Sequence, residues 1–473
     1  MRDYETLTGV AGYYRVLTCP RGSLTPEVRP VIVRGVVDSS TTTRPGATAN
    51  RVRGDLVAVG VAALLVALAV AVRESPPLYG RWLPHAGPAS VFAVLLAVAA
   101  VVWGPALATS LPWRGLLATG YVASLAWLLS LALVDGWERG FAARLTTPHE
   151  YLHEVGGITD ISTMLDTFAD RIVAGTPGFW TTHVAGHPPG AVLVFVWLDR
   201  LGLSGGVWAA FACVAAAGLV SVAVPVTLAA LGRAEAARAC WPFVVLFPGA
   251  VWLAVSADAV FAGVTACGIA LLAQACRAAH SGSRYAPAQA VGAGVLLGFG
   301  LFLSYGLVLL GLVALAVGLL GRSARATLYA AAGVAAVVAA FAMAGFWWFD
   351  GYRQVVERYH QGIASERPYS YWVWANLACL VLAVGPAVVA GLRRAWLSRG
   401  WTPMVMLTAA ALCAVLVADV SGLSKAEVER IWLPFAVWLL PATALLPPGT
   451  RRWWLAAQAA TALAVNHLML TVW

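Results

Sequence analysis

The stretch GVWAAFACVAAAGLVSVAVPVTLAALG, residues 206–232, contains no charged residue and exceeds the roughly 20 residues that an α-helix needs to cross a bilayer. Similar apolar stretches recur from Leu56 almost to the end of the sequence. The 473 residues are 60% hydrophobic and only 11% charged, and the mean hydropathy is +0.78. A soluble domain has roughly a quarter charged residues, so this composition cannot supply a water-facing surface. The sequence therefore predicts an all-α, multi-pass membrane protein.

The apolar stretches predict about thirteen membrane-spanning helices. They are expected at 55–73, 88–109, 115–134, 206–232, 240–256, 259–277, 286–304, 306–321, 326–347, 373–392, 402–420, 431–446 and 453–471. The piece 190–203 is apolar but is interrupted by Asp199 and Arg200, so we expect an interfacial helix on the outer leaflet rather than a span. Residues 1–53 contain no long apolar run and are expected to form a disordered cytoplasmic tail, which leaves 54–473 as the membrane domain.

The positions of the arginines indicate the orientation in the membrane. With the N-terminus in the cytoplasm, most of the 31 basic residues fall in the tail and in short inner loops, whereas most acidic residues fall outside. The outer loops are then 135–205, 348–372 and 421–430. The formal charge of +9 reflects this topology, and no basic surface suited to nucleic acid is present in the sequence. We expect a plasma-membrane protein whose active face is extracytoplasmic.

Candidate chemistry begins where the third expected span ends. Asp135 and Gly136 close this span, and Trp137, Glu138 and Arg139 follow at once. A carboxylate at a helix end on the membrane surface can stay ionised while it is sheltered from bulk water. Such a group can accept a proton from a hydroxyl as a general base. A solvated helix end is the alternative, and the long acidic loop that follows favours function.

Two histidine-containing segments lie in the first outer loop. Residues 149–154 read HEYLHE and match the zinc-protease pattern, but no third ligand follows at close spacing, so we favour a chance match. The segment THVAGHPPG, residues 182–190, contains two prolines that prevent a helix and fix an extended corner. His187 is either a substrate-facing histidine or part of a turn before the next helix, and the sequence leaves both open.

A second acidic candidate lies farther along the chain. Asp258 stands in a very short outer turn between two apolar stretches, and Pro248 precedes it. A carboxylate in such a place is costly unless it has a partner. Proline loosens the helix end and lets it bend toward a cavity. We therefore expect Asp258 to be a functional residue.

The outer loop 350–372, DGYRQVVERYHQGIASERPYSYW, mixes arginines with aromatic rings. Guanidinium groups bind phosphate oxygens through two parallel hydrogen bonds, and the rings can meet a lipid or a sugar. An aromatic belt with arginines that reach the interface is the alternative. The candidate substrate-binding residues here are Arg353, Arg358, Tyr359, His360 and Arg367.

The last outer turn adds charges directly before a span. Arg430 is a second candidate phosphate ligand. Glu427 or Glu429 would orient its guanidinium group.

In their order along the chain, these segments resemble the GT-C superfamily of membrane glycosyltransferases, which use polyprenyl-phosphate sugars. The resemblance covers about residues 115–450. It rests on Asp135 after an early span, on HPPG at 187–190, on FPGAVWLAVSAD at 247–258, on the aromatic and arginine-rich loop, and on EVERIWLPF at 427–435. Three departures stand out: two extra spans at 55–109, no soluble C-terminal domain, and DGWE in place of a strict Asp-x-Asp.

The resemblance implies transfer of a sugar from a polyprenyl-phosphate carrier to an acceptor hydroxyl of a glycan or lipid on the outer membrane face. It makes Asp135 the base and Asp258 a second acidic site residue. Glu138, three residues after Asp135, is a further catalytic candidate from the sequence itself. The four arginines 353, 358, 367 and 430 would bind the phosphate. The arginine bias suggests an actinobacterium, in which mannose and arabinose are the most plausible sugars.

The resemblance fixes no cofactor, and a divalent metal ion is the one candidate. A membrane transporter of a small or lipid-linked substrate is the competing hypothesis. A transporter should place ionisable residues within its spans and show internal repeats, whereas here these residues gather at one face.

Overall fold

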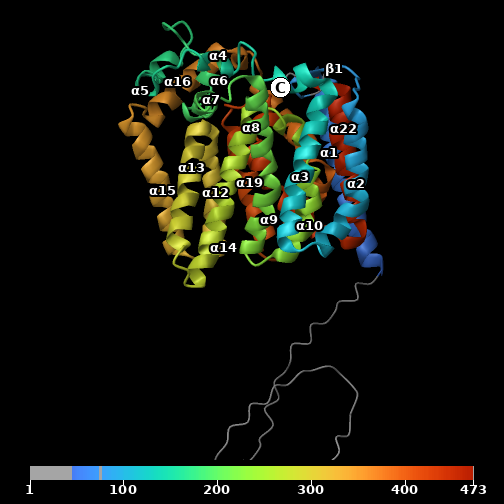
Figure 1. The fold of residues 1–473 in the computed structure, drawn as a ribbon. Coiled ribbons are helices and arrows are strands. Elements are labelled where there is room, and N and C mark those ends of the chain that lie inside the picture. Colours follow the sequence, from blue (N-terminus) through green and yellow to red (C-terminus); the bar gives the residue numbers. More distant parts are fainter. Residues whose placement is uncertain (1–44, 74–76, 472–473) are drawn as a thin grey trace, which may run out of the picture. The chain divides into compact units, whose positions relative to one another are not determined.

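The computed structural model of the protein describes residues 45–73 and 77–471. Residues 1–44, most of the expected cytoplasmic tail, lie outside these described ranges. Helix α1 (Pro45–Arg73) begins inside the range that the sequence assigns to the tail. The chain divides into Met1–Thr48 and Ala49–Trp473, and the second unit is a bundle of helices (Figure 1).

Eight helices within the described ranges are long and apolar enough to cross a membrane. A helix satisfies its own backbone hydrogen bonds, which the interior of a bilayer requires. Helix α12 is central, since 78% of its most apolar window is buried, compared with 17% for α1 and for α15. The eight are α1, α2 (Ala89–Ser110), α3 (Trp113–Ala132) with its extension η1 (Leu133–Asp135), α8 (Gly206–Gly218) continued by α9 (Val220–Ala230), α12 (Ala257–His280), α13 (Ala286–Leu303), α15 (Ala324–Met343) and α19 (Pro403–Val420). The protein is therefore a multi-pass membrane protein.

The other five expected spans are shorter or broken, and prolines lie at several of the breaks. Helices α17 (Tyr369–Val384) and α18 (Pro386–Trp396) bend by 109° at Gly385, and Leu433–Leu445 meets Pro448–Leu468 at 113°. Counting each bent pair as one span gives at most ten in the part of the chain described, so thirteen stays a prediction. The remaining elements of these segments are α10 (Ala234–Val245), α11 (Ala250–Leu253), η4 (Tyr305–Leu310), α14 (Gly311–Gly321), α21 (Leu433–Ala436), η6 (Leu440–Leu445), η7 (Pro448–Thr450) and α22 (Arg451–Leu468).

Short helices gather at one end of the bundle, which we call the cap end (Figure 1). The segment expected as an interfacial helix is α7, and it lies at this end. Gly190, its first residue, lies against the end of α13, where a Cβ atom would overlap the carbonyl of Phe302. The short elements at or near this end are η2 (Glu138–Ala142), α4 (Leu152–Val155), α5 (Ile161–Asp166), η3 (Ala169–Arg171), α6 (Thr182–Ala185), α7 (Gly190–Arg200), α16 (Trp348–Gln361), η5 (Ile363–Ser365) and α20 (Val428–Ile431).

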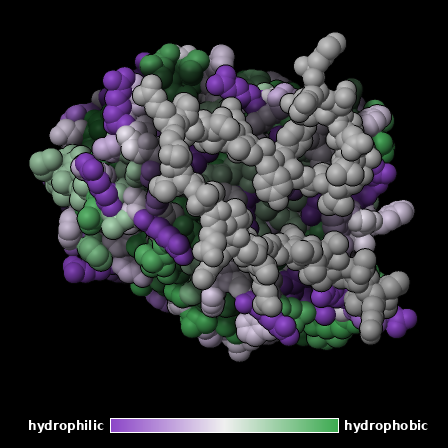
Figure 2. All heavy atoms as spheres, turned by 90° about the horizontal axis from the view of Figure 1, so that it is seen from below, coloured by the Kyte–Doolittle hydropathy of each residue, from purple (hydrophilic) through white to green (hydrophobic). Residues whose placement is uncertain are grey.

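The opposite end of the bundle holds the connections from α9 to α10, from α12 to α13 and from α14 to α15 (Figure 1). Figure 2 views this end and shows hydrophilic residues around its edge. Asp55, which is fully buried, joins α1 to α18 here through ion pairs with Arg393 at 2.9 Å and Arg394 at 2.5 Å. Arg233, Arg284 and Arg322 lie in the three connections at this end.

Two short strands tie the last described residues to the connection between α1 and α2. Strand β1 (Gly80–Trp82) pairs antiparallel with β2 (Met469–Thr471), so that Gly80 lies opposite Thr471. Two further backbone hydrogen bonds continue the pairing, and one of them joins the amide of His85 to the carbonyl of His467 at 2.8 Å. This pairing holds His85 near the end of α3, where Asp135 lies.

Candidate functional site

Asp258 lies in the first turn of α12 at the cap end. The chain is extended at Ser256 and the helix begins at Ala257, so the carboxylate is close to the positive end of the helix dipole. Only 4% of the residue is exposed. A charge buried in this way requires a partner.

Arg430 provides that partner. Its Nη1 is 3.2 Å from Oδ2 of Asp258, and its Nη2 is 3.8 Å from Oε2 of Glu427. Glu427 also accepts a hydrogen bond at 2.8 Å from Nη2 of Arg367. Burial lowers the pKa of Arg430, but Asp258 and Glu427 raise it by more, so the net pKa lies above its ordinary value. Two arginines and two carboxylates thus form one network in which charges of opposite sign alternate.

The loop that carries Glu427 has a strained backbone. Ala426 and Glu427 both adopt the left-handed conformation, with φ of 67° and 62°, which costs an L-residue about 1–2 kcal/mol. The buried amide of Asn376 donates to the carbonyl of Ser424 at 2.8 Å and accepts from the amide of Ala426 at 3.2 Å. The hydroxyl of Tyr359 accepts from the backbone amide of Lys425 at 3.0 Å. These hydrogen bonds hold the strained turn, and with it Glu427 and Arg430.

The long segment between α3 and α8 adds a buried pair to the same neighbourhood. Oε2 of Glu150 lies 3.0 Å from Nδ1 of His183, and both residues are buried. Burial alone would raise the pKa of the Glu150 carboxyl, but the hydrogen bond and the charge of His183 outweigh it, so the pKa is below its ordinary value. Arg430 contributes to the same shift, which places Glu150 within its electrostatic range.

Tyr151 and His187 form the next contact. The Tyr151 hydroxyl is 2.9 Å from Nδ1 of His187, which also lies 2.8 Å from the carbonyl of His183. Burial lowers the pKa of His187 to about 4, so its ring is neutral at physiological pH. We call the set of Arg430, Asp258, Glu427, Arg367, Glu150, His183, Tyr151 and His187 the Arg430 cluster. It unites the loops at 149–151 and 182–190 with α12 and α20.

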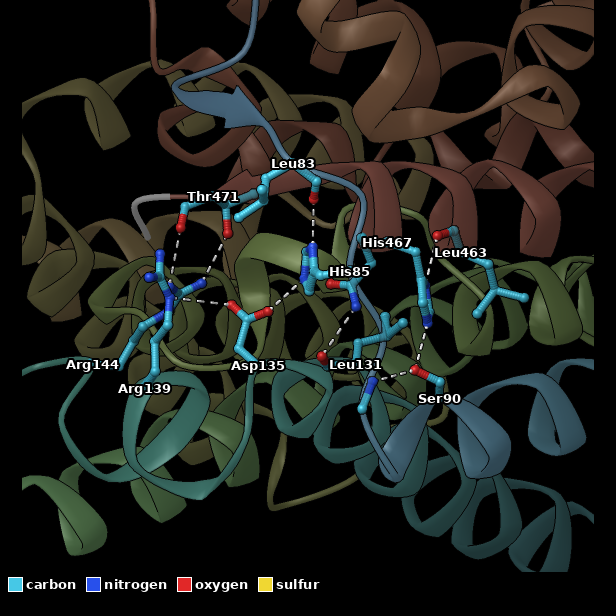
Figure 3. A network of polar contacts seen from close by, with 12 residues as sticks. Leu83, His85, Ser90, Leu131, Asp135, Arg139, Arg144, Leu463, His467 and Thr471 are labelled. Atoms are coloured by element: carbon cyan, nitrogen blue, oxygen red, sulfur yellow. Dashed lines mark hydrogen bonds and ion pairs between the residues drawn. The ribbon is translucent and has the colours of Figure 1, made fainter.

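Asp135 belongs to a separate network (Figure 3). Its Oδ1 is 2.8 Å from Nε2 of His85, and its Oδ2 is 3.8 Å from Nε of Arg139. Nδ1 of His85 lies 2.7 Å from the carbonyl of Leu83, so both ring nitrogens face oxygen atoms. Both contacts can be hydrogen bonds only if the His85–Asp135 pair holds one more proton than a neutral imidazole and a carboxylate together.

Arg144 connects the two networks electrostatically. Its Nη2 donates to Oγ1 of Thr471 at 2.9 Å (Figure 3). Burial lowers the pKa of Arg144 to about 10, and the charges of both Asp135 and Glu150 act against that shift. The Asp135 network therefore lies within electrostatic range of the Arg430 cluster.

The remaining candidate residues are not brought into either network. Glu138 is exposed at the start of η2, and His360 is exposed near the end of α16. Arg353 is exposed and pairs with Asp350 at 3.2 Å. The guanidinium group of Arg358 lies 5.5 Å from the ring of Phe179. Tyr359 is the exception in this segment because it contacts the loop of Glu427.

A pocket of about 560 Å³ lies beside Arg367, and we call it the arginine pocket. Arg73, at the end of α1, also lines it, with its guanidinium group 5.4 Å from the ring of Tyr371 and 5.7 Å from that of Trp372. The guanidinium group of Arg367 lies 5.8 Å from the ring of Tyr79. The pocket thus combines two arginines with aromatic rings and with one carboxylate, that of Glu366.

Sequence reasoning missed Glu150, Tyr151 and His183 as site residues. The signal for Glu150 and Tyr151 was the segment HEYLHE, whose zinc-protease pattern drew attention to His149 and His153 instead. His183 lies in THVAGHPPG, where attention went to His187. In the structure Glu150 turns inward to His183. In the ranges described, no group of three or more His, Cys, Asp and Glu side chains is arranged as a metal site.

The fold and these networks define a multi-pass membrane protein with a buried polar cluster at one end. No protein-family model and no curated protein matches the sequence. Among solved structures, the chain is similar to the crystal structure of ArnT from Cupriavidus metallidurans in the apo state, with a TM-score of 0.38 and 18% sequence identity. The match covers 72% of this chain and 60% of that chain.

Proposed function

We propose that the protein is a membrane glycosyltransferase that moves a sugar from a polyprenyl-phosphate carrier to an acceptor hydroxyl on the outer membrane face. Mannose and arabinose are the proposed sugars. The observation that carries the proposal is the arginine pocket, which is joined to the buried Asp258 through the chain Arg367, Glu427 and Arg430.

The arginine pocket suits a phosphate attached to a lipid. Arg73 can present a guanidinium fork to phosphate oxygens. Arg367 can add its N–H groups that are not already donated to the carbonyl of Lys425 and to Glu427. Val72 of α1 lines the pocket, and it and Leu68 are exposed on α1, which has the length and composition of a membrane span. We propose that the carrier phosphate lies between the two arginines and that its prenyl chain follows α1 into the bilayer.

The proposed reaction moves one sugar and one proton. The acceptor oxygen forms a bond to the anomeric carbon of the sugar, and the bond from that carbon to the phosphate oxygen breaks. The phosphate leaves with the electron pair, and the arginines stabilise its charge. Asp135 accepts the acceptor proton, and its Oδ2, which Arg139 approaches only to 3.8 Å, is the proposed receiving atom. Asp258 positions Arg430.

The test is incubation of purified protein with a panel of polyprenyl-phosphate sugars and measurement of carrier consumption. Arg367→Lys keeps the charge but loses the fork, so carrier affinity should fall. Arg358→Lys is the matched control, because Arg358 lies against Phe179 and does not line the arginine pocket. Equal carrier affinity in both variants would remove Arg367 from the phosphate site.

Asp135→Asn tests the base in the same assay. Loss of a general base costs about 100- to 10,000-fold in rate, while the carrier should still bind. Near wild-type transfer would move the base to Glu138 or Asp258. If Glu138→Gln and Asp258→Asn also kept transfer, the glycosyltransferase proposal would have to be abandoned. A transporter would move the carrier-linked sugar without consuming it.

A further inference from the structure

A second pocket, of about 420 Å³, lies between α4, α7 and the loop that leads into α8. Its polar lining comes from Asp199, His153, Ser204 and Thr146, and we call it the Asp199 pocket. None of these residues belongs to the Arg430 cluster. The volume is within the range of small-molecule sites, which is roughly 300–1,000 Å³.

Glycines shape one wall of this pocket. Gly205 has φ of 87°, a conformation that L-residues rarely adopt, and the chain turns there into α8. A Cβ atom on Gly206 would overlap the carbonyl of Ala142 and would come 2.8 Å from the methyl group of Thr146. The close approach of these backbones holds the start of α8 against the end of η2 and the segment that follows it, next to the pocket.

The charged groups in the lining of the Asp199 pocket indicate which class of ligand it can bind. Asp199 and His153 are exposed, and no residue in the described part of the chain forms an ion pair or side-chain hydrogen bond with either. Arg200, the neighbour of Asp199, donates instead to the carbonyl of Thr159 at 2.9 Å. The lining contains no arginine or lysine, so the carboxylate of Asp199 disfavours a phosphate.

The same groups suit a ring that carries hydroxyls. A carboxylate accepts two hydroxyl hydrogen bonds, while imidazole and serine can both donate and accept. The hydroxyl of Thr146 lies 3.0 Å from the carbonyl of Ala143, to which it donates, so it offers lone pairs to a ligand. Leu152 and Phe195 supply apolar lining for the C–H face of such a ring.

One wall of the Asp199 pocket is in contact with the Arg430 cluster. The ring of Phe195 stacks on that of Tyr151, with 5.3 Å between centroids. Tyr151 in turn contacts His187. We propose that the Asp199 pocket binds a neutral, hydroxyl-rich ring, which is a saccharide. The further statement that this saccharide belongs to the acceptor rests on the proposed function.

The experiment measures protection of a cysteine placed in the pocket. Full-length Leu203→Cys protein in nanodiscs is labelled with a maleimide, because Leu203 lines the pocket without a polar group, and the wild-type protein gives the background of its native cysteines. At about ten times its dissociation constant, methyl mannoside or methyl arabinoside should slow labelling about tenfold, because only unoccupied protein reacts. Inorganic phosphate should leave the rate unchanged.

Asp199→Asn, made in the Leu203→Cys protein, should lose most of this protection. Asp170→Asn is the matched control, because Asp170 is an exposed acid of the same outer loop that does not line the pocket. The proposal is overturned if neither glycoside slows labelling, if phosphate protects equally, or if Asp199→Asn behaves like the control.

Labelling requires neither carrier nor turnover, so it is independent of the proposed reaction. Protection in a protein that never consumes a carrier would support the saccharide site and refute the glycosyltransferase. Carrier consumption without protection would support the glycosyltransferase and refute the saccharide site.

Discussion

Replacement of Arg430 by Met should destabilise the protein strongly. Arg430 and Asp258 are 5% and 4% exposed, so the substitution leaves a buried carboxylate without its guanidinium partner. Breaking a buried pair from one side costs about 3–5 kcal/mol. In domains of 150–250 residues each kcal/mol shifts Tm by roughly 2–4 °C, so a fall of several degrees is expected. Thermal unfolding in detergent, followed by tryptophan fluorescence, measures it.

The chain offers a control with the same geometry. Arg353 and Asp350 are also 3.2 Å apart, but their side chains are 77% and 53% exposed. Exposed pairs contribute about 0–1 kcal/mol, so Arg353→Met should hardly change Tm. The two substitutions therefore compare a buried ion pair with an exposed one at the same N–O distance.

The double variant Arg430→Met/Asp258→Asn should recover most of the lost stability, because it removes the uncompensated charge. It should nevertheless remain inactive in transfer. Equal changes in Tm for Arg430→Met and Arg353→Met would refute the reasoning, as would a failure of Asp258→Asn to rescue Arg430→Met.

Three further predictions concern the strained turn, a buried carboxyl and the topology. Ala426→Gly should stabilise the protein by up to about 1 kcal/mol because glycine adopts the left-handed conformation without strain. Ala375→Gly, within α17, is the control and should destabilise the protein by about 1 kcal/mol. Changes in Tm of the same sign in both variants would contradict this prediction. Burial raises the pKa of Glu429 from 4.5 to about 7, so its contribution to stability is complete below pH 4.5 and is lost as pH rises through 7. The Tm advantage of Glu429→Gln should therefore grow over that interval, and a gap independent of pH would argue against it. Cysteines at 160 and 360 should react with an impermeant label from outside and those at 235 and 323 should not; the reverse pattern would invert the orientation.

The sequence located the helical segments because their apolar composition leaves few alternatives in a membrane. The sequence could not give the number of helices that cross the membrane, because a bend such as the one at Gly385 depends on tertiary contacts. The side chain of Gln458, in α22, accepts from the amide of Ala387 just after this bend, at 3.1 Å. Such a partner lies far away in the sequence and carries no local pattern.

The sequence predicted a site residue where a single charged side chain would be energetically costly without a partner. Asp258 in a short turn required a partner, and Arg430 was flagged independently, but nothing in the sequence joins the two. Glu150 was missed because its partner, His183, lies outside its own motif. His85 was missed because it lies in the connection after α1, where only the pairing of β1 with β2 brings it to Asp135.

The pairing of β1 with β2 also sets an order of events during synthesis. Residues 80–82 leave the ribosome long before residues 469–471, so the short sheet forms only after nearly all the spans have been inserted. Until then Arg144 lacks Thr471, and His85 lacks the backbone bond to His467. The Asp135 network is therefore completed last, after nearly all of the helices that surround it are in place.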